Sequence, residues 1–233
     1  MFQPPKLQLG DNAVILSPAG KIDAGLVEKA VELLSEWGLR VEISENALCH
    51  TGRFSGFVDQ RLSDLQKAMN DPDVKLIFCS RGGYGTVHLL DKLDFTGIKQ
   101  HPKWVVGYSD ITVLHAALQS NGIMSIHGPM AKHFAEEGAD DISVRFTKAI
   151  LVGERIVYEI PVANYAHLNR KGKASGRLFG GNLSVFCGIL GSKFAKIPKN
   201  GVCLSKTLVK NRIKLTGTSI NLNSQEFLTK FQG

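Results

Sequence analysis

The chain has 233 residues and is 43% hydrophobic, which suffices for one large globular domain or two small ones. Its net charge of +7 does not indicate nucleic acid binding, because most of the excess positive charge lies in one stretch, 203–233, which has five basic residues and one acidic residue. No basic stripe with interleaved aromatic residues occurs elsewhere in the sequence. The sequence has no signal-peptide pattern, no apolar run of membrane-spanning length and no Cys-x-x-Cys spacing, so we expect a cytoplasmic protein with reduced cysteines, no membrane partner and no metal.

The first 120 residues alternate between strand and helix patterns. Apolar runs predict strands over residues 13–16, 39–43, 74–80 and 104–106. Amphipathic patterns predict a helix that Asp23 caps and that ends before Gly38, and further helices over residues 57–70, 87–90 and 109–119. This alternation indicates an α/β fold with a doubly wound parallel sheet, in which ligands bind beyond the carboxyl ends of the strands.

The pattern changes after about residue 139. Residues 156–160 alternate like a half-buried strand, residues 169–176 are polar, and Gly180-Gly181-Asn182 precedes an apolar segment. We therefore expect an α/β domain over residues 1–140, a linker over 141–170 and the start of a second domain over 171–202.

Ser109 lies in Gly107-Tyr108-Ser109-Asp110, between a predicted strand and a predicted helix. A serine at such a turn exposes its hydroxyl beside a helix N-terminus, which is the geometry of a nucleophile elbow. The same spacing also suits an N-cap, for which Ser and Asp are favoured on structural grounds alone. The spacing by itself leaves both interpretations open.

A second motif, Arg81-Gly82-Gly83-Tyr84-Gly85, ends the predicted strand 74–80. Glycines in such a turn let backbone N–H groups approach a ligand or a developing oxyanion. The structural alternative is a tight strand-to-helix turn that needs glycine for its backbone conformation.

Together with further blocks in the same order, these motifs resemble the LD-carboxypeptidases. This family of serine peptidases includes muramoyl-tetrapeptide carboxypeptidases and microcin-immunity peptidases. The resemblance covers about residues 5–202. Its other blocks are Ser17-Pro18-Ala19-Gly20, Arg61-Leu62-Ser63-Asp64-Leu65, His127-Gly128-Pro129-Met130 and Gly180-Gly181-Asn182-Leu183.

The resemblance implies that Ser109 is a nucleophile working with a histidine base, which a glutamate orients. It implies oxyanion donors in the backbone N–H groups of Asp110 and of Gly82 or Gly83, and neither metal nor cofactor. The implied substrate is a murein-derived peptide, cleaved before its terminal D-alanine. The family has a β-rich C-terminal domain, of which residues 171–202 would be an incomplete part, and it often pairs as homodimers.

The family's glutamate and histidine lie in C-terminal blocks that this sequence lacks. After residue 202 the sequence matches nothing in the family. If the codons for residues 205–210 are read one base out of frame, they can encode Glu-Asp-Ile-Gly-Glu, which resembles the family's acidic block. We therefore expect one lost base near codons 202–203 and an out-of-frame tail over 203–233. That tail is expected to be mobile and open to proteases, and the chain is expected to have little or no activity.

The other histidines are poor candidates for the base. His115 lies six residues beyond Ser109 and is expected to be a packed or surface side chain. His127 ends the next predicted strand and is expected to line the site in a structural role. The remaining histidines show no metal-ligand spacing.

Other functions are open on the sequence. A non-catalytic protein would use residues 81–85 to hold a peptide carboxylate, and a microcin-type immunity peptidase would cleave a peptide antibiotic. A glutamine amidotransferase would need a cysteine where Ser109 stands. A dinucleotide-binding protein would need Gly-x-Gly-x-x-Gly after the first strand, and that motif is missing.

Overall fold

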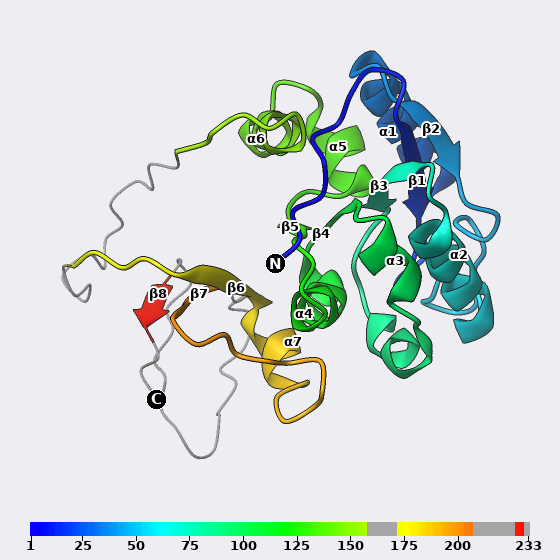
Figure 1. Ribbon diagram of the computed structural model, residues 1–233. Helices are drawn as coiled ribbons and strands as arrows, with labels where there is room; N and C mark the ends of the chain where they lie inside the picture. Colours follow the sequence, from blue (N-terminus) through cyan, green and yellow to red (C-terminus); the bar gives the residue numbers. More distant parts are fainter. Residues whose placement is uncertain (158–171, 207–226, 231–233) are drawn as a thin grey trace.

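The computed structural model describes residues 1–157, 172–206 and 227–230 (Figure 1). Its larger sheet has the strand order β2-β1-β3-β4-β5, and every neighbouring pair is parallel. The predicted α/β fold with a doubly wound parallel sheet is confirmed. The strands are β1 Asn12–Leu16, β2 Arg40–Ile43, β3 Val74–Cys79, β4 Trp104–Gly107 and β5 Ile126–His127.

Helices cover both faces of this sheet because successive side chains of a strand point to opposite sides. In β1, Ala13 and Ile15 pack with helices α1, α5 and α6, whereas Val14 and Leu16 pack with α2, α3 and α4. The helices are α1 Ala24–Glu36, α2 Val58–Asn70, α3 Thr96–Gln100, α4 Thr112–Ser120, α5 Ala131–Glu137 and α6 Ile142–Leu151. No helix in the described ranges is long and apolar enough to cross a bilayer.

Two predicted helices differ in detail from the structure. The segment predicted as a helix over 87–90 is the 3-10 helix η1, Thr86–Lys92. The helix predicted over 109–119 begins with a 3-10 turn, η2 Ser109–Ile111, before α4 starts. Both segments lead out of a tight turn, where the shorter hydrogen bonds of a 3-10 helix are common.

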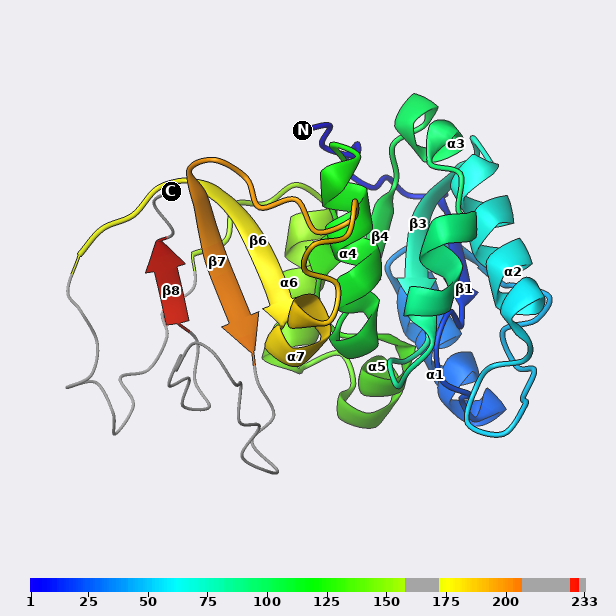
Figure 2. The same cartoon turned by 90° about the horizontal axis from the view of Figure 1, so that it is seen from below.

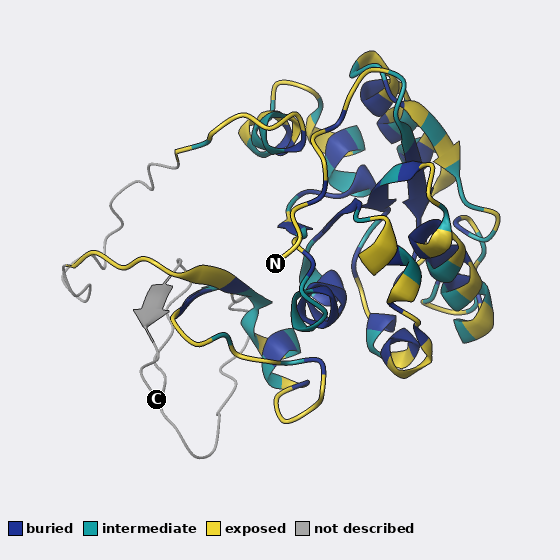
Figure 3. Ribbon diagram, in the orientation of Figure 1, coloured by how far each residue is buried: buried dark blue, intermediate teal, exposed yellow. Residues whose placement is uncertain are grey.

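A smaller sheet has the order β6-β7-β8, in which β6 and β7 are parallel and β7 and β8 are antiparallel. Its elements are β6 Arg177–Asn182, α7 Leu183–Cys187, β7 Gly201–Lys206 and β8 Phe227–Lys230. Figure 2 shows α4 between this sheet and the larger one, and α4 contacts both β5 and β6. Because α4 is covered on both sides, seven of its consecutive residues are buried, as the dark blue of Figure 3 shows.

The structure differs from the predicted domain boundaries. Helix α6 occupies the first part of the segment predicted as a linker, and its Val144 and Leu151 are buried in the core. Residues 156–157 form no strand, and 158–160 lie outside the described residues. Phe179 and Phe186 share a hydrophobic cluster with Leu114 of α4, so β6 and α7 pack directly on the first domain.

Strand β7 also crosses the predicted start of the out-of-frame tail. Its last four residues, 203–206, pair with β6, and Cys203 is buried. These four residues therefore belong to a packed strand, contrary to the expectation of a wholly mobile tail. Residues 207–226 and 231–233 lie outside the described part of the chain.

Candidate active site

Ser109 stands at a sharp turn after β4 with a φ of 64°. In the described part of the chain, Asn200 is the only other non-glycine residue with a positive φ. This left-handed conformation is strained for a residue with a side chain and is the conformation expected at a nucleophile elbow. Gly107 makes the turn possible, because a Cβ there would lie 2.9 Å from Cγ1 of Ile111. Glycine at position 107 is thus a steric requirement of this turn.

The glycine turn after β3 lies against the same serine. A Cβ on Gly82 would lie 3.0 Å from Cβ of Ser109 and 3.3 Å from its Oγ, so a side chain there would crowd the serine. Gly83 and Gly85 have φ values of 128° and 120°, a region that side chains rarely adopt. The two motifs therefore meet at the carboxyl ends of two adjacent strands.

A buried arginine connects the loops around this turn. Nη1 of Arg61 donates to the carbonyl of Pro18 at 2.8 Å and to that of Gly85 at 3.0 Å. Oδ2 of Asp110 accepts a hydrogen bond at 2.9 Å from the Thr86 amide, which follows Gly85. Burial lowers the pKa of Arg61, and the negative charge of Asp110 opposes that shift.

These roles of Arg61 and Asp110 were not predicted. Asp110 was expected to contribute its backbone amide, whereas its side chain is buried and holds the start of η1. Arg61 belongs to a block shared with the family. Nothing local in the sequence shows which carbonyls it reaches, because Pro18 and Gly85 are far from it along the chain.

The end of β6 docks beside the elbow. The Asn182 amide donates to Oγ1 of Thr112, the first residue of α4, at 3.0 Å. A Cβ on Gly181 would lie 3.1 Å from Cδ2 of His127, and the His127 ring lies 6.4 Å from the ring of Tyr108. These contacts bring His127 next to the elbow.

His127 is solvent-accessible but crowded by protein atoms. This partial desolvation lowers its pKa; a hydrogen bond with its own backbone opposes the shift, and the positive charge of Lys206 adds to it. Lys206 ends β7, and its Nζ lies 6.0 Å from the centroid of the Tyr108 ring. His127 was predicted to line the site, and the structure places its ring near that of Tyr108; the approach of Lys206 was not predicted.

His115 is a packed structural side chain, as predicted. Its Nε2 lies 2.8 Å from the Gly107 carbonyl and its Nδ1 lies 2.8 Å from Oγ of Ser125. A carbonyl only accepts, so Nε2 carries the proton and Nδ1 accepts from the serine hydroxyl. Burial, with a smaller effect of His127, lowers the pKa of His115 to about 3. Both ring nitrogens are engaged, which leaves neither for Ser109.

The free energy of unfolding is expected to fall in acid because of His115. Its folded pKa of about 3 lies below the value of about 6.5 in the unfolded chain. Its contribution is therefore complete above pH 6.5 and is lost as the pH falls toward 3. Urea unfolding at pH 7 and pH 5 should differ by about 2 kcal/mol from this group.

The variant His115→Gln should lose this part of the pH dependence. The matched control is His101→Gln, which removes an exposed histidine and should keep it. Equal pH dependence in the two variants would contradict the assigned role of His115.

The catalytic set is incomplete in the described part of the chain. No histidine or carboxylate there accepts a hydrogen bond from Oγ of Ser109. Within the same residues, no group of three His, Cys, Asp or Glu side chains could hold a metal ion. The geometry thus provides a strained serine beside a glycine turn, without a base positioned to take its proton.

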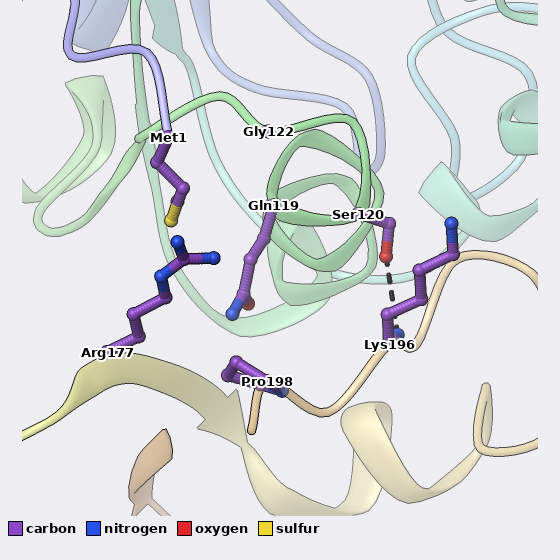
Figure 4. Close-up of a pocket in the computed structure, with 7 residues that line it drawn as sticks. All are labelled: Met1, Gln119, Ser120, Gly122, Arg177, Lys196 and Pro198. Atoms are coloured by element: carbon purple, nitrogen blue, oxygen red, sulfur yellow. Dashed lines mark hydrogen bonds between the residues drawn. The ribbon is translucent and has the colours of Figure 1, made fainter. Parts of the chain in front are cut away.

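A cavity of about 260 Å³ lies at the other end of α4 from Ser109. Figure 4 shows it between the end of that helix and the start of β6. Its lining residues are Met1, Gln119, Ser120, Gly122, Arg177, Lys196 and Pro198. This cavity is separate from the candidate active site.

Comparisons with known proteins agree with the resemblance. A family model of the N-terminal domain of LD-carboxypeptidases matches residues 14–128, a range that includes Ser109 and Gly82. A protein of Bacillus subtilis strain 168 named "probable murein peptide carboxypeptidase" is 35% identical over 83% of this chain and 61% of its own length. The murein tetrapeptide carboxypeptidase of Pseudomonas aeruginosa is 30% identical over 76% of this chain and 60% of its own length.

The fold is also found in solved structures. The crystal structure of an MccF-like protein from Bacillus anthracis strain Ames matches with a TM-score of 0.79 at 27% identity, over 89% of this chain and 70% of that one. The chain spans about three fifths of the length of the two curated relatives. The matched domain, the relatives and the shared fold together show that this chain belongs to the LD-carboxypeptidase family.

Proposed function

We propose that this chain carries the nucleophile of a serine-type LD-carboxypeptidase that removes the terminal D-alanine from murein tetrapeptide. The observation that supports this most is the conformation of Ser109, whose positive φ places it directly against Gly82. Strain of this kind is retained in proteins mainly where function requires it. The names of the two curated relatives favour a murein peptide as the substrate.

In the proposed reaction, Oγ of Ser109 attacks the carbonyl carbon that precedes D-alanine. The negative charge on the carbonyl oxygen would be stabilised by the backbone N–H groups of Asp110 and of Gly82 or Gly83. A base must take the serine proton and return it to the leaving amine, and water must then release the acyl group. The resemblance assigns the base to a histidine in a block that the printed sequence does not contain.

We therefore expect little or no hydrolysis by the 233-residue chain. Incubation of the purified chain with murein tetrapeptide should release no more free D-alanine than its Ser109→Ala variant does. Release that depends on Ser109 would show that another group supplies the base. That result would contradict the prediction that the chain is inactive but would support the proposed reaction.

A microcin-type immunity peptidase is the second candidate function. The similarity to an MccF-like structure favours it, because that fold match extends over 89% of this chain. Its substrate would be a peptide antibiotic. A comparison of both substrates on protein made with the lost base restored separates the two candidates, and binding without turnover of either by that protein would favour a non-catalytic peptide-binding protein.

A further inference from the structure

Three loops beside the Ser109 elbow are joined by backbone hydrogen bonds. The Gly20 amide, in the loop after β1, donates to the Gly82 carbonyl at 3.2 Å. The Lys21 amide donates to the carbonyl of Arg53 at 3.2 Å. The loop after β1, the loop after β2 and the turn after β3 therefore form one connected surface at the carboxyl edge of the sheet.

Each of these loops carries one basic side chain, and we call Lys21, Arg53 and Arg81 the cationic rim. Nη1 of Arg81 donates to the Lys21 carbonyl at 3.0 Å, which fixes the guanidinium in place. In the described part of the chain, no member of the rim forms an ion pair with a carboxylate. Asp23, the acidic residue nearest to Lys21 along the chain, caps α1 instead.

A cluster of three aromatic side chains, Phe54, Tyr84 and His88, lies beside the rim. Tyr84 is 46% exposed, and its ring packs against Phe54 and edge-on against His88, with centroid distances of 6.2 and 5.4 Å. Cζ of Arg53 lies 5.9 Å from the centroid of the Tyr84 ring, so a cation–π contact helps to hold the guanidinium. A guanidinium that is stacked in this way keeps N–H donors for a planar anion.

We propose that the cationic rim binds a carboxylate of the peptide substrate and that Arg53 contributes to substrate specificity. This inference rests on the proposed function. Arg81 directly precedes Gly82, which contacts Ser109, so the rim adjoins the position of the scissile bond. Three unpaired cations around one open edge repel one another, and a bound carboxylate relieves that repulsion.

A murein tetrapeptide with L-lysine as its diamino acid offers two carboxylates to the rim. One belongs to the terminal D-alanine, and the other is the α-carboxylate that the γ-linked D-glutamate leaves free. Both would form charge-assisted hydrogen bonds with a guanidinium, and a planar carboxylate suits the paired donors of arginine better than a neutral amide does.

The test measures binding of the synthetic peptide L-Ala-γ-D-Glu-L-Lys-D-Ala by calorimetry, with Ser109→Ala in every form so that no turnover occurs. Adding Arg53→Gln is expected to weaken binding about tenfold at low salt, which is the loss of one charge-assisted hydrogen bond. The matched control is Arg145→Gln, which removes an exposed charge on α6 and should leave the affinity unchanged. High salt should reduce the difference in affinity between the forms with and without Arg53→Gln.

Two amidated peptides identify the carboxylate that is bound. The peptide whose amide replaces the bound carboxylate should bind about tenfold more weakly and should then be insensitive to Arg53→Gln. The proposed role of the rim is contradicted if Arg53→Gln weakens the binding of both amidated peptides equally. It is also contradicted if the Arg53→Gln and Arg145→Gln forms bind the tetrapeptide equally well. In both cases the proposed function stands. A tetrapeptide that binds to no form would overturn both.

Discussion

Restoring one base near codons 202–203 is expected to raise the rate of D-alanine release by about 10⁴-fold over that of the 233-residue chain. The physical reason is that the members of a catalytic triad act as a unit, so a nucleophile without its base retains little activity. In the described part of the chain, Ser109 has no histidine partner, and both ring nitrogens of His115 are engaged elsewhere. The measurement is the initial rate of D-alanine release from murein tetrapeptide by the two purified proteins.

The control is the restored protein with Ser109→Ala, which should fall back to the rate of the present chain. Two results would contradict the prediction. One is a restored protein that is no faster than the 233-residue chain, which would contradict the proposal that a base was lost. The other is a reading frame that, once restored, encodes no late histidine, which would leave the serine without the base that the family resemblance implies.

Replacing Arg61 with Met is expected to lower the free energy of unfolding by about 3 kcal/mol. The substitution removes the donor to the Pro18 carbonyl and one of two donors to the Gly85 carbonyl, which also accepts from the His88 amide. It also removes the positive charge that interacts with the buried Asp110. Urea unfolding monitored by circular dichroism measures the change.

Arg145→Met is the control for Arg61→Met, because it removes an exposed arginine from α6 and should change stability by less than about 0.5 kcal/mol. Arg61→Lys should recover only part of the loss, since a lysine ammonium does not reproduce the geometry of the guanidinium. A loss of under about 1 kcal/mol in Arg61→Met would show that water replaces the missing donor. The arginine would then not be what holds the loops together.

Much of the fold could be predicted from the sequence because the signals are local. The first four strands follow from short apolar runs, and β4 and the helix after it leave a turn in which Ser109 must sit. The missed helix α6 also had a local signal, since its buried Val144, Thr147 and Leu151 are spaced at three and four residues. The linker was predicted from the segments that follow this helix, residues 156–160 and 169–176.

The candidate site shows the same division between features with a local sequence signal and features that depend on tertiary contacts. The sequence by itself determined Ser109 and Gly82 as candidates, because a strand-to-helix turn and a glycine turn are both properties of neighbouring residues. Only the tertiary structure decided that His115 is engaged with Gly107 and Ser125, and that Arg61 joins Pro18 to Gly85. The Arg61 contacts join loops that are distant along the chain, and the neighbouring positions of β1 and β3 in the larger sheet bring these loops together.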